Sequence, residues 1–78
     1  MLDTKHLQAL AAVITEQSFE KAARTLFLTQ SAVSQRIRQL ENQVGQMLVV
    51  RSTPVRPTPA GMAMLRHFRQ LAVLEESL

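Results

Sequence analysis

The chain of 78 residues contains no cysteine, tryptophan or tyrosine, and it has only two glycines and three prolines. Without cysteine there is no disulfide, no thiolate metal site and no cysteine nucleophile, so helix packing or a second chain must stabilise so small a domain. Two glycines are too few for a phosphate-binding loop, and we interpret Gly45 and Gly61 as helix punctuation. No apolar run approaches the ~18 residues that cross a bilayer.

Groups that could support catalysis or bind a metal are also scarce. The two histidines, His6 and His67, lie in opposite terminal segments with few carboxylates near either one. We therefore predict no enzyme activity, no metal site and no cofactor, and we interpret the four methionines as core residues. The sequence favours a cytoplasmic protein that makes no membrane contact.

Positive charge is concentrated in the middle of the chain. Residues 21–69 contain eight lysines and arginines but one acid, Glu41, and the other acids lie toward the two ends. Such a distribution favours a polyanionic partner, with nucleic acid ahead of a membrane surface. The alternative is an ordinary solvated basic face.

Hydrophobic periodicity and capping residues predict three short helices in the first part of the chain. Apolar stripes indicate helices over residues 5–16 and 30–44, and a shorter helix begins after Ser18. Gly45 is a good stop for the third helix.

The rest of the chain predicts a strand, a loop and a long helix. Residues 47–50 are β-prone, and the proline-rich residues 51–57 cannot continue a helix, so they form a tight loop or a small hairpin. Thr58 followed by Pro59 starts a last helix over residues 59–77. The fold class is therefore mainly α, a three-helix core with a short β wing and a long final helix.

The second and third helices form a helix-turn-helix pattern. If the apolar stripe of the third helix faces inward, its N-terminal half presents polar, uncharged side chains outward. Amides and hydroxyls suit hydrogen bonding to base edges in a DNA major groove, whereas a merely solvated face usually carries more lysine and glutamate. The candidate base-reading residues are Gln30, Ser31, Ser34 and Gln35.

Polar and basic residues flank this face and are candidates for contacts with DNA phosphates on either side of a groove. Arg51 and Arg56 lie on the two arms of the proline-rich loop, and the alternative for each is an ordinary surface arginine. The candidate backbone and wing contacts are Thr29, Arg36, Arg38, Arg51 and Arg56.

The last helix carries a broader apolar stripe than one short domain covers. Pairing with a second copy would bury this stripe and place two reading helices on neighbouring turns of DNA. The alternative is that the stripe packs only on the first helix of its own chain. The candidate dimerisation residues are Leu65, Phe68, Leu71, Leu74 and Leu78.

Several motifs together resemble one family over essentially the whole chain. They are the run from Ser18 to Ala23, the run from Leu28 to Ile37, Leu40-Glu41, and Thr58-Pro59-Ala60-Gly61. With these motifs the chain resembles the N-terminal DNA-binding domain of LysR-type transcriptional regulators. Its wing, residues 48–58, looks most like the ArgP/LysG branch, whose members control basic amino acid export and related genes.

The resemblance implies a winged helix-turn-helix over residues 1–58 and a dimerising linker helix over residues 59–78. It also implies a C-terminal domain, absent from this chain, through which a small-molecule effector acts, and a higher oligomer for a full-length protein. The base-reading residues of the family fall on the four positions named above. Many members have proline in place of Ser31 and arginine in place of Gln35, so Gln35 would contact adenine or act through water.

The predicted function is therefore sequence-specific binding of double-stranded DNA by a homodimer, with residues 30–44 in the major groove and residues 51–57 on the backbone or minor groove. A rival hypothesis is a helical dimerisation or adaptor module whose basic face meets an acidic protein. The uncharged glutamine and serine face favours DNA, because an acidic partner would not need it.

Overall fold

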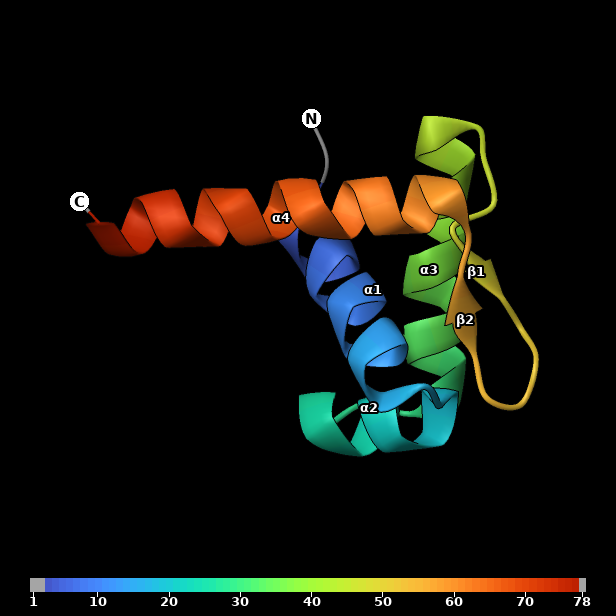
Figure 1. Cartoon of the computed structure of the whole chain (residues 1–78). Coiled ribbons are helices and arrows are strands. Elements are labelled where there is room, and N and C mark those ends of the chain that lie inside the picture. The colour runs from blue at the N-terminus through green and yellow to red at the C-terminus, as the bar shows by residue number, and fades with distance from the viewer. Residues whose placement is uncertain (1–2, 78) are drawn as a thin grey trace.

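The computed structural model describes residues 3–77 as four helices and a two-stranded antiparallel hairpin (Figure 1). The predicted helix bounds are confirmed to within a residue or two. The elements are α1 (Thr4–Glu16), α2 (Phe19–Leu26), α3 (Gln30–Val44), β1 (Val49–Val50), β2 (Arg56–Pro57) and α4 (Pro59–Ser77). No helix within these residues is long and apolar enough to cross a membrane.

Side-chain caps start the helices. Asp3, Ser18 and Thr29 each accept a hydrogen bond from a backbone N–H in the first turn of α1, α2 and α3, over 2.9, 3.1 and 3.0 Å. Thr58 accepts from the Gly61 N–H at 3.1 Å in the same way. Caps of this kind contribute about 1 kcal/mol each. The capping residues therefore fix where the helices begin, as the sequence predicted.

Left-handed residues end the first three helices. Gly45 ends α3 with a φ of 72°, as predicted. Gln17 and Phe27 end α1 and α2 with φ values of 58° and 57°. Residues other than glycine adopt this left-handed conformation with strain. The sequence does not signal these two stops. They turn the chain sharply on both sides of α2 and so fix its place between α1 and α3.

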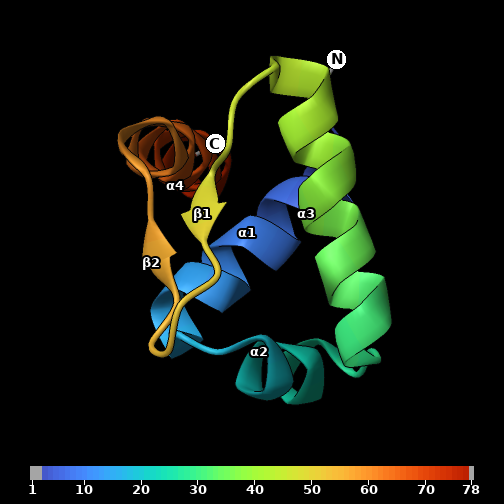
Figure 2. The same cartoon turned by 90° about the vertical axis from the view of Figure 1, so that its right-hand side faces the viewer.

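The core lies where α1, α2 and α3 meet, and α4 crosses it at one end (Figures 1 and 2). Small side chains of α2, Ala22 and Ala23, are buried and allow the helices to approach closely. Met64 and Phe68 of α4 pack against this core. The larger side chains that are fully buried include Leu10, Val13, Val33, Ile37 and Leu40.

The interpretation of the methionines as core residues is wrong for two of them. Met47, in the link between α3 and β1, is 62% exposed, and Met62, on the outer side of α4, is 39% exposed. Helical spacing alone does not distinguish an outward residue near a helix start from an inward one. Met64 does pack on the core.

The interpretation of Gly61 as helix punctuation is also wrong. Gly61 is the third residue of α4, and a Cβ atom there would lie 1.9 Å from the carbonyl oxygen of Leu48. The same carbonyl accepts a hydrogen bond from the Thr58 N–H at 3.0 Å. Glycine is therefore required because the start of α4 lies directly on the chain that enters β1.

The hairpin is shorter than the predicted β-prone run of residues 47–50. Val49 and Val50 pair with Pro57 and Arg56, and the Leu48 N–H is bonded instead to the carboxylate of Glu41 at 2.8 Å. The wing therefore consists of two short strands joined by residues 51–55. It lies on the same side of the molecule as α3, at the right-hand side of Figure 1.

Candidate nucleic-acid interface

The polar face of α3 is accessible along its N-terminal half. Gln30, Ser31 and Gln35 are exposed and Ser34 is half-buried. Because successive helix residues are about 100° apart, Gln35 points away from the core residues Val33 and Ile37. The structure thus leaves all four predicted base-reading side chains outside the core, on a helix whose amino end is capped by Thr29.

Arg51, at the end of β1, lies against this face. Its guanidinium Nη1 donates a hydrogen bond to Ser34 Oγ at 2.8 Å, and its Cζ lies 4.7 Å from the centroid of the Phe19 ring. Gln30 and Arg51 line one open hollow of about 370 Å³, and Arg38 and Arg51 line another of about 700 Å³. The fold therefore brings Gln30, Ser34, Arg38 and Arg51 to one surface.

The other arm of the wing carries Arg56. This exposed residue lies in β2 opposite Val50, on the arm that the sequence predicted. The neighbouring Val55 is buried, and its N–H donates to the carbonyl of Gln17 at 3.0 Å. The wing is thus anchored at the residue next to Arg56, and Arg56 extends from a fixed position.

Arg36 does not join this surface. It is half-buried and lies about 160° around α3 from Arg38, because each helix residue turns the chain by about 100°. Its position places it on the opposite flank of the helix from Ser34. The structure therefore places Arg36 and Arg38, two of the predicted backbone contacts, on different flanks of α3.

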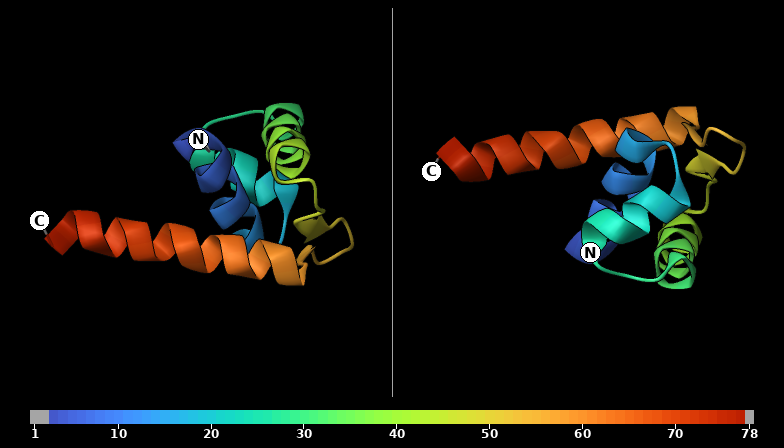
Figure 3. Two further views of the ribbon diagram at one scale, coloured as in Figure 1. Left: turned by 90° about the horizontal axis from the view of Figure 1, so that it is seen from above. Right: turned by 90° about the horizontal axis from the view of Figure 1, so that it is seen from below.

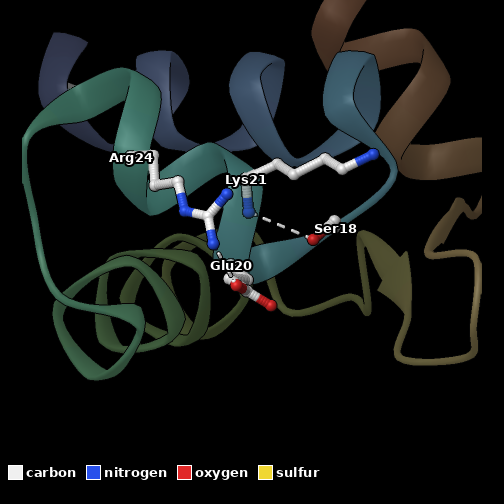
Figure 4. Close-up of polar contacts among 4 residues, drawn as sticks. All are labelled: Ser18, Glu20, Lys21 and Arg24. Carbon is white, nitrogen blue, oxygen red and sulfur yellow. Dashed lines mark hydrogen bonds and ion pairs between the residues drawn. The ribbon is translucent and has the colours of Figure 1, made fainter.

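The charge of the surface is more one-sided than the composition indicates. Glu41, the one acid of residues 21–69, is 7% exposed and accepts the Leu48 N–H, so it contributes little negative charge to the surface. Arg24 is the exception among the basic residues, since it pairs with Glu20 one turn earlier on α2, while the Lys21 side chain extends away from that pair (Figure 4). Exposed positive charge on and beside α3 therefore comes from Arg38 and Arg51, and the other arm of the wing adds Arg56.

The predicted dimerisation residues separate into different environments. Leu65 is 1% exposed within its own chain, Phe68 packs against the core, and Leu71 is 43% exposed. The side chain of Leu74 and the whole of Leu78 lie outside the described residues. The second half of α4 projects beyond the other elements (Figure 3). The apolar stripe is thus covered by its own chain near Leu65 and uncovered at Leu71.

The sequence contains a sign of the buried Glu41 but none of the contact between Arg51 and Ser34. Glu41 stands alone among eight basic residues, and this isolation could have pointed to a buried carboxylate with a structural role. The contact of Arg51 with Ser34 joins residues 17 apart, on elements whose packing no periodicity predicts. The arginine could be recognised as a candidate contact, but its partner could not.

Comparisons with known proteins agree on one family. The family model described as bacterial regulatory helix-turn-helix protein, lysR family, matches residues 4–62. The chain is 58% identical over 74 residues to the HTH-type transcriptional regulator ArgP of Escherichia coli (strain K12 / DH10B), covering 95% of this chain and 25% of that protein. The chain thus spans about a quarter of the length of the curated relatives that it matches.

Solved structures give the same result. The crystal structure of ArgP from Mycobacterium tuberculosis aligns with a TM-score of 0.93 and 55% identity, over 99% of this chain and 29% of that chain. The crystal structure of the BenM_DBD/benA site 1 DNA complex aligns with a TM-score of 0.89 and 36% identity, over 96% of this chain and 85% of that chain. With a winged helix-turn-helix fold and a family match over most of its length, this chain belongs to the LysR family of bacterial helix-turn-helix regulatory proteins.

Proposed function

We propose that the chain binds double-stranded DNA in a sequence-specific manner and forms the DNA-binding part of a transcriptional regulator. The observation that carries this proposal is the uncharged amide and hydroxyl face of α3, bordered by Arg38 and by Arg51 at the end of β1, with Arg56 exposed on the other arm of the wing. Its likeness to a LysR-type domain solved on DNA supports the same function.

In this proposal α3 enters the major groove, where Gln30, Ser31, Ser34 and Gln35 contact base edges. Glutamine can bond bidentately to adenine, and serine hydroxyls can bond to several bases. The wing lies along the backbone or the minor groove and contributes Arg51 and Arg56. Arg36, on the other flank of α3, would contact phosphates on the opposite side of the groove.

The phosphate contacts would form at the ends of the elements. Thr29 Oγ1 accepts the Ala32 N–H at 3.0 Å, so its hydroxyl hydrogen can still be donated to a phosphate oxygen. Backbone N–H groups at the amino end of α3 add partial positive charge at the same place. Arg38, further along α3, and the wing arginines would supply the other phosphate contacts.

We also propose that two chains pair through α4, with residues 1–58 as the DNA-binding unit and residues 59–78 as the dimerisation helix. Leu71 supports this division, because it is an exposed leucine on the projecting half of α4 (Figure 3). Leu65 and Phe68 support the pairing indirectly, since they fix the direction of α4 by packing on their own chain.

The DNA-binding proposal is tested by selecting a preferred duplex from a random pool and titrating it against a scrambled duplex of equal length. We expect tighter binding to the selected duplex at two salt concentrations, and a logarithmic salt slope of about 0.9 per phosphate contact on both duplexes. Both duplexes carry the same charge, so equal affinities would favour the rival hypothesis of a basic face that binds any polyanion or an acidic protein.

A more specific proposal, which depends on the likeness to ArgP, concerns the genes that are regulated. We propose that they include genes for the transport of basic amino acids, and that a small molecule acts through a separate C-terminal domain. The test is binding of the chain to DNA upstream of such transport genes in its own genome. Upstream DNA of unrelated genes is the control, and equal binding to both would contradict the proposal.

A further inference from the structure

The hydrogen bond between Arg51 and Ser34 determines how the Ser34 hydroxyl can be used. We infer that Arg51 is a positioning residue that holds Ser34 Oγ as an acceptor and thereby directs the Ser34 hydroxyl to donate to a hydrogen-bond acceptor on a base edge. This inference depends on the proposed DNA binding. It assigns Arg51 a role in sequence discrimination in addition to its proposed contact with the DNA backbone.

The direction of the bond follows from the chemistry of the two groups. A guanidinium has five N–H donors and no acceptor, whereas a serine hydroxyl has one hydrogen and two lone pairs. At 2.8 Å between Nη1 and Oγ, Arg51 must therefore donate and Ser34 must accept. The bond is charge-assisted, so it is stronger than a bond between neutral groups and holds the hydroxyl oxygen toward the arginine.

Arg51 is fixed in this position by more than Ser34. Its Cζ lies 4.7 Å from the centroid of the Phe19 ring, at the amino end of α2. The far arm of the wing is held by the hydrogen bond from the Val55 N–H to the Gln17 carbonyl. The guanidinium is thus placed by α2, α3 and the wing before any ligand arrives, and its remaining N–H groups stay available to a phosphate.

The positive charge decides which base atoms Ser34 accommodates. The partly positive hydrogens of a base amino group would lie beside the positive guanidinium, which is unfavourable. A base acceptor would instead be attracted both to the hydroxyl hydrogen and to the guanidinium charge. The major groove offers acceptors at purine N7, guanine O6 and thymine O4, and donors at adenine N6 and cytosine N4. Ser34 should therefore recognise one of the three acceptors and reject the two amino groups.

The first test measures a specificity ratio, the Kd for a scrambled duplex divided by the Kd for the selected duplex. Ser34→Ala should lower this ratio about tenfold, the loss of one hydrogen bond at the upper end of its usual range. Arg51→Ala should lower it to a similar extent and also weaken binding to both duplexes. The double variant should show no further loss in the ratio, because both changes remove the same interaction.

Arg66→Ala is the matched control, since it removes one exposed positive charge from α4 and leaves α3 and the wing intact. Its specificity ratio should equal that of the unmodified chain. Thermal unfolding of every variant identifies a chain that does not fold, and Arg51→Lys then replaces Arg51→Ala, because lysine keeps the charge without the guanidinium geometry. Additive losses of Ser34→Ala and Arg51→Ala, or an unchanged ratio in Arg51→Ala, would overturn the inference.

The second test identifies the base atom. Selected duplexes receive single replacements that remove N7 (7-deazapurine), guanine O6 (2-aminopurine), thymine O4 (5-methyl-2-pyrimidinone) or an amino group (purine for adenine, 2-pyrimidinone for cytosine). One acceptor removal should weaken the unmodified chain about tenfold and leave Ser34→Ala and Arg51→Ala unaffected. An amino-group dependence that disappears in Ser34→Ala, or the lack of any acceptor dependence that disappears in Ser34→Ala, overturns the inference alone, whereas an amino-group dependence that persists in Ser34→Ala belongs to the glutamines. Failure of the chain to enrich any duplex overturns the proposed function, and this inference with it.

Discussion

At the scale of single residues, Gln35 provides the clearest test of base reading. Its side chain is exposed, and it points away from Val33 and Ile37, so replacement by alanine should not disturb the core. Gln35→Ala should weaken binding to the selected duplex by about 1–3 kcal/mol, because a base-edge hydrogen bond is lost. Binding to a scrambled duplex and its salt slope should change little. Paired titrations of both duplexes at one salt concentration measure the difference.

The control for this change is Gln43→Ala, which alters the same residue type near the far end of α3. It should leave both affinities unchanged. If Gln35→Ala lost the same affinity for both duplexes, Gln35 would instead contact the DNA backbone. Thermal unfolding should shift little in either variant, because alanine has the higher helix propensity.

The sequence predicted which residues of the interface face outward, but not which residues they contact. Gln30, Ser31 and Gln35 could be placed outside the core because helical periodicity relates each of them to the buried stripe of the same helix. The bond from Arg51 to Ser34 depends on how a two-residue strand packs on a helix, and no local pattern contains that information. Arg36 lies apart from the predicted surface for a related reason, since adjacency in sequence to Gln35 does not mean a shared face.

At the scale of elements, the junction of α4 with β1 depends on Gly61. A Cβ atom at this position would lie 1.9 Å from the Leu48 carbonyl oxygen, and backbone cannot rotate away as a side chain can. Overpacking costs up to about 3 kcal/mol, and alanine's helix propensity returns about 1 kcal/mol. Gly61→Ala should therefore lower the free energy of unfolding by about 2 kcal/mol. Urea denaturation measures this loss.

Gly45→Ala is the comparison for Gly61→Ala. Gly45 has a φ of 72°, and a Cβ atom added to it would meet no other atom within 4 Å, so alanine there is strained without a clash. The cost should be about 1 kcal/mol, the usual penalty of a left-handed conformation. A larger loss in Gly45→Ala than in Gly61→Ala would contradict the close approach of α4 to β1.

Glu41 joins the end of α3 to the start of β1. Its buried carboxylate accepts the Leu48 N–H, and removal of that acceptor leaves a buried donor without a partner. Glu41→Ala should therefore lower the free energy of unfolding by about 1–3 kcal/mol, as chemical denaturation can measure. Glu41→Gln keeps an acceptor oxygen and should lose less. Equal losses in the two variants would show that the hydrogen bond contributes nothing.

The helix bounds and the presence of a small hairpin were predictable, but the extent of its strands was not, for a physical reason. Each helix has a side-chain cap and an apolar stripe, both of which are written in consecutive residues. The extent of β1 depends on which backbone groups have other partners, and the Leu48 N–H is taken by Glu41, seven residues earlier. Strand length in a small wing is thus decided by contacts between elements.

At the scale of the whole molecule, the proposed dimer depends on the exposed half of α4. Leu71 is 43% exposed on a helix that extends beyond the core, and a second copy that pairs along α4 would cover it. Sedimentation equilibrium at high micromolar concentration should give the mass of a dimer. Leu71→Asp should shift the mass toward the monomer.

The matched control is Gln70→Asp, which adds the same charge to the preceding exposed residue. It should leave the association unchanged. A monomeric mass for the unmodified chain, with and without DNA, would contradict pairing through α4.

The wing is small, but it is attached at four places, each in or directly beside a different helix. Val55 bonds to the chain after α1, Arg51 contacts α2 and α3, and the Thr58 N–H at the start of α4 bonds to Leu48. An isolated hairpin of two-residue strands is not stable in water, so its order derives from these attachments. The amide hydrogens of Val55 and Thr58 should therefore exchange with solvent only when the helices unfold, at the rate of core amides in α1 and α3. Hydrogen exchange measured by NMR would show this as a single cooperative opening, whereas faster exchange at Val55 and Thr58 alone would mark the hairpin as a separately melting unit.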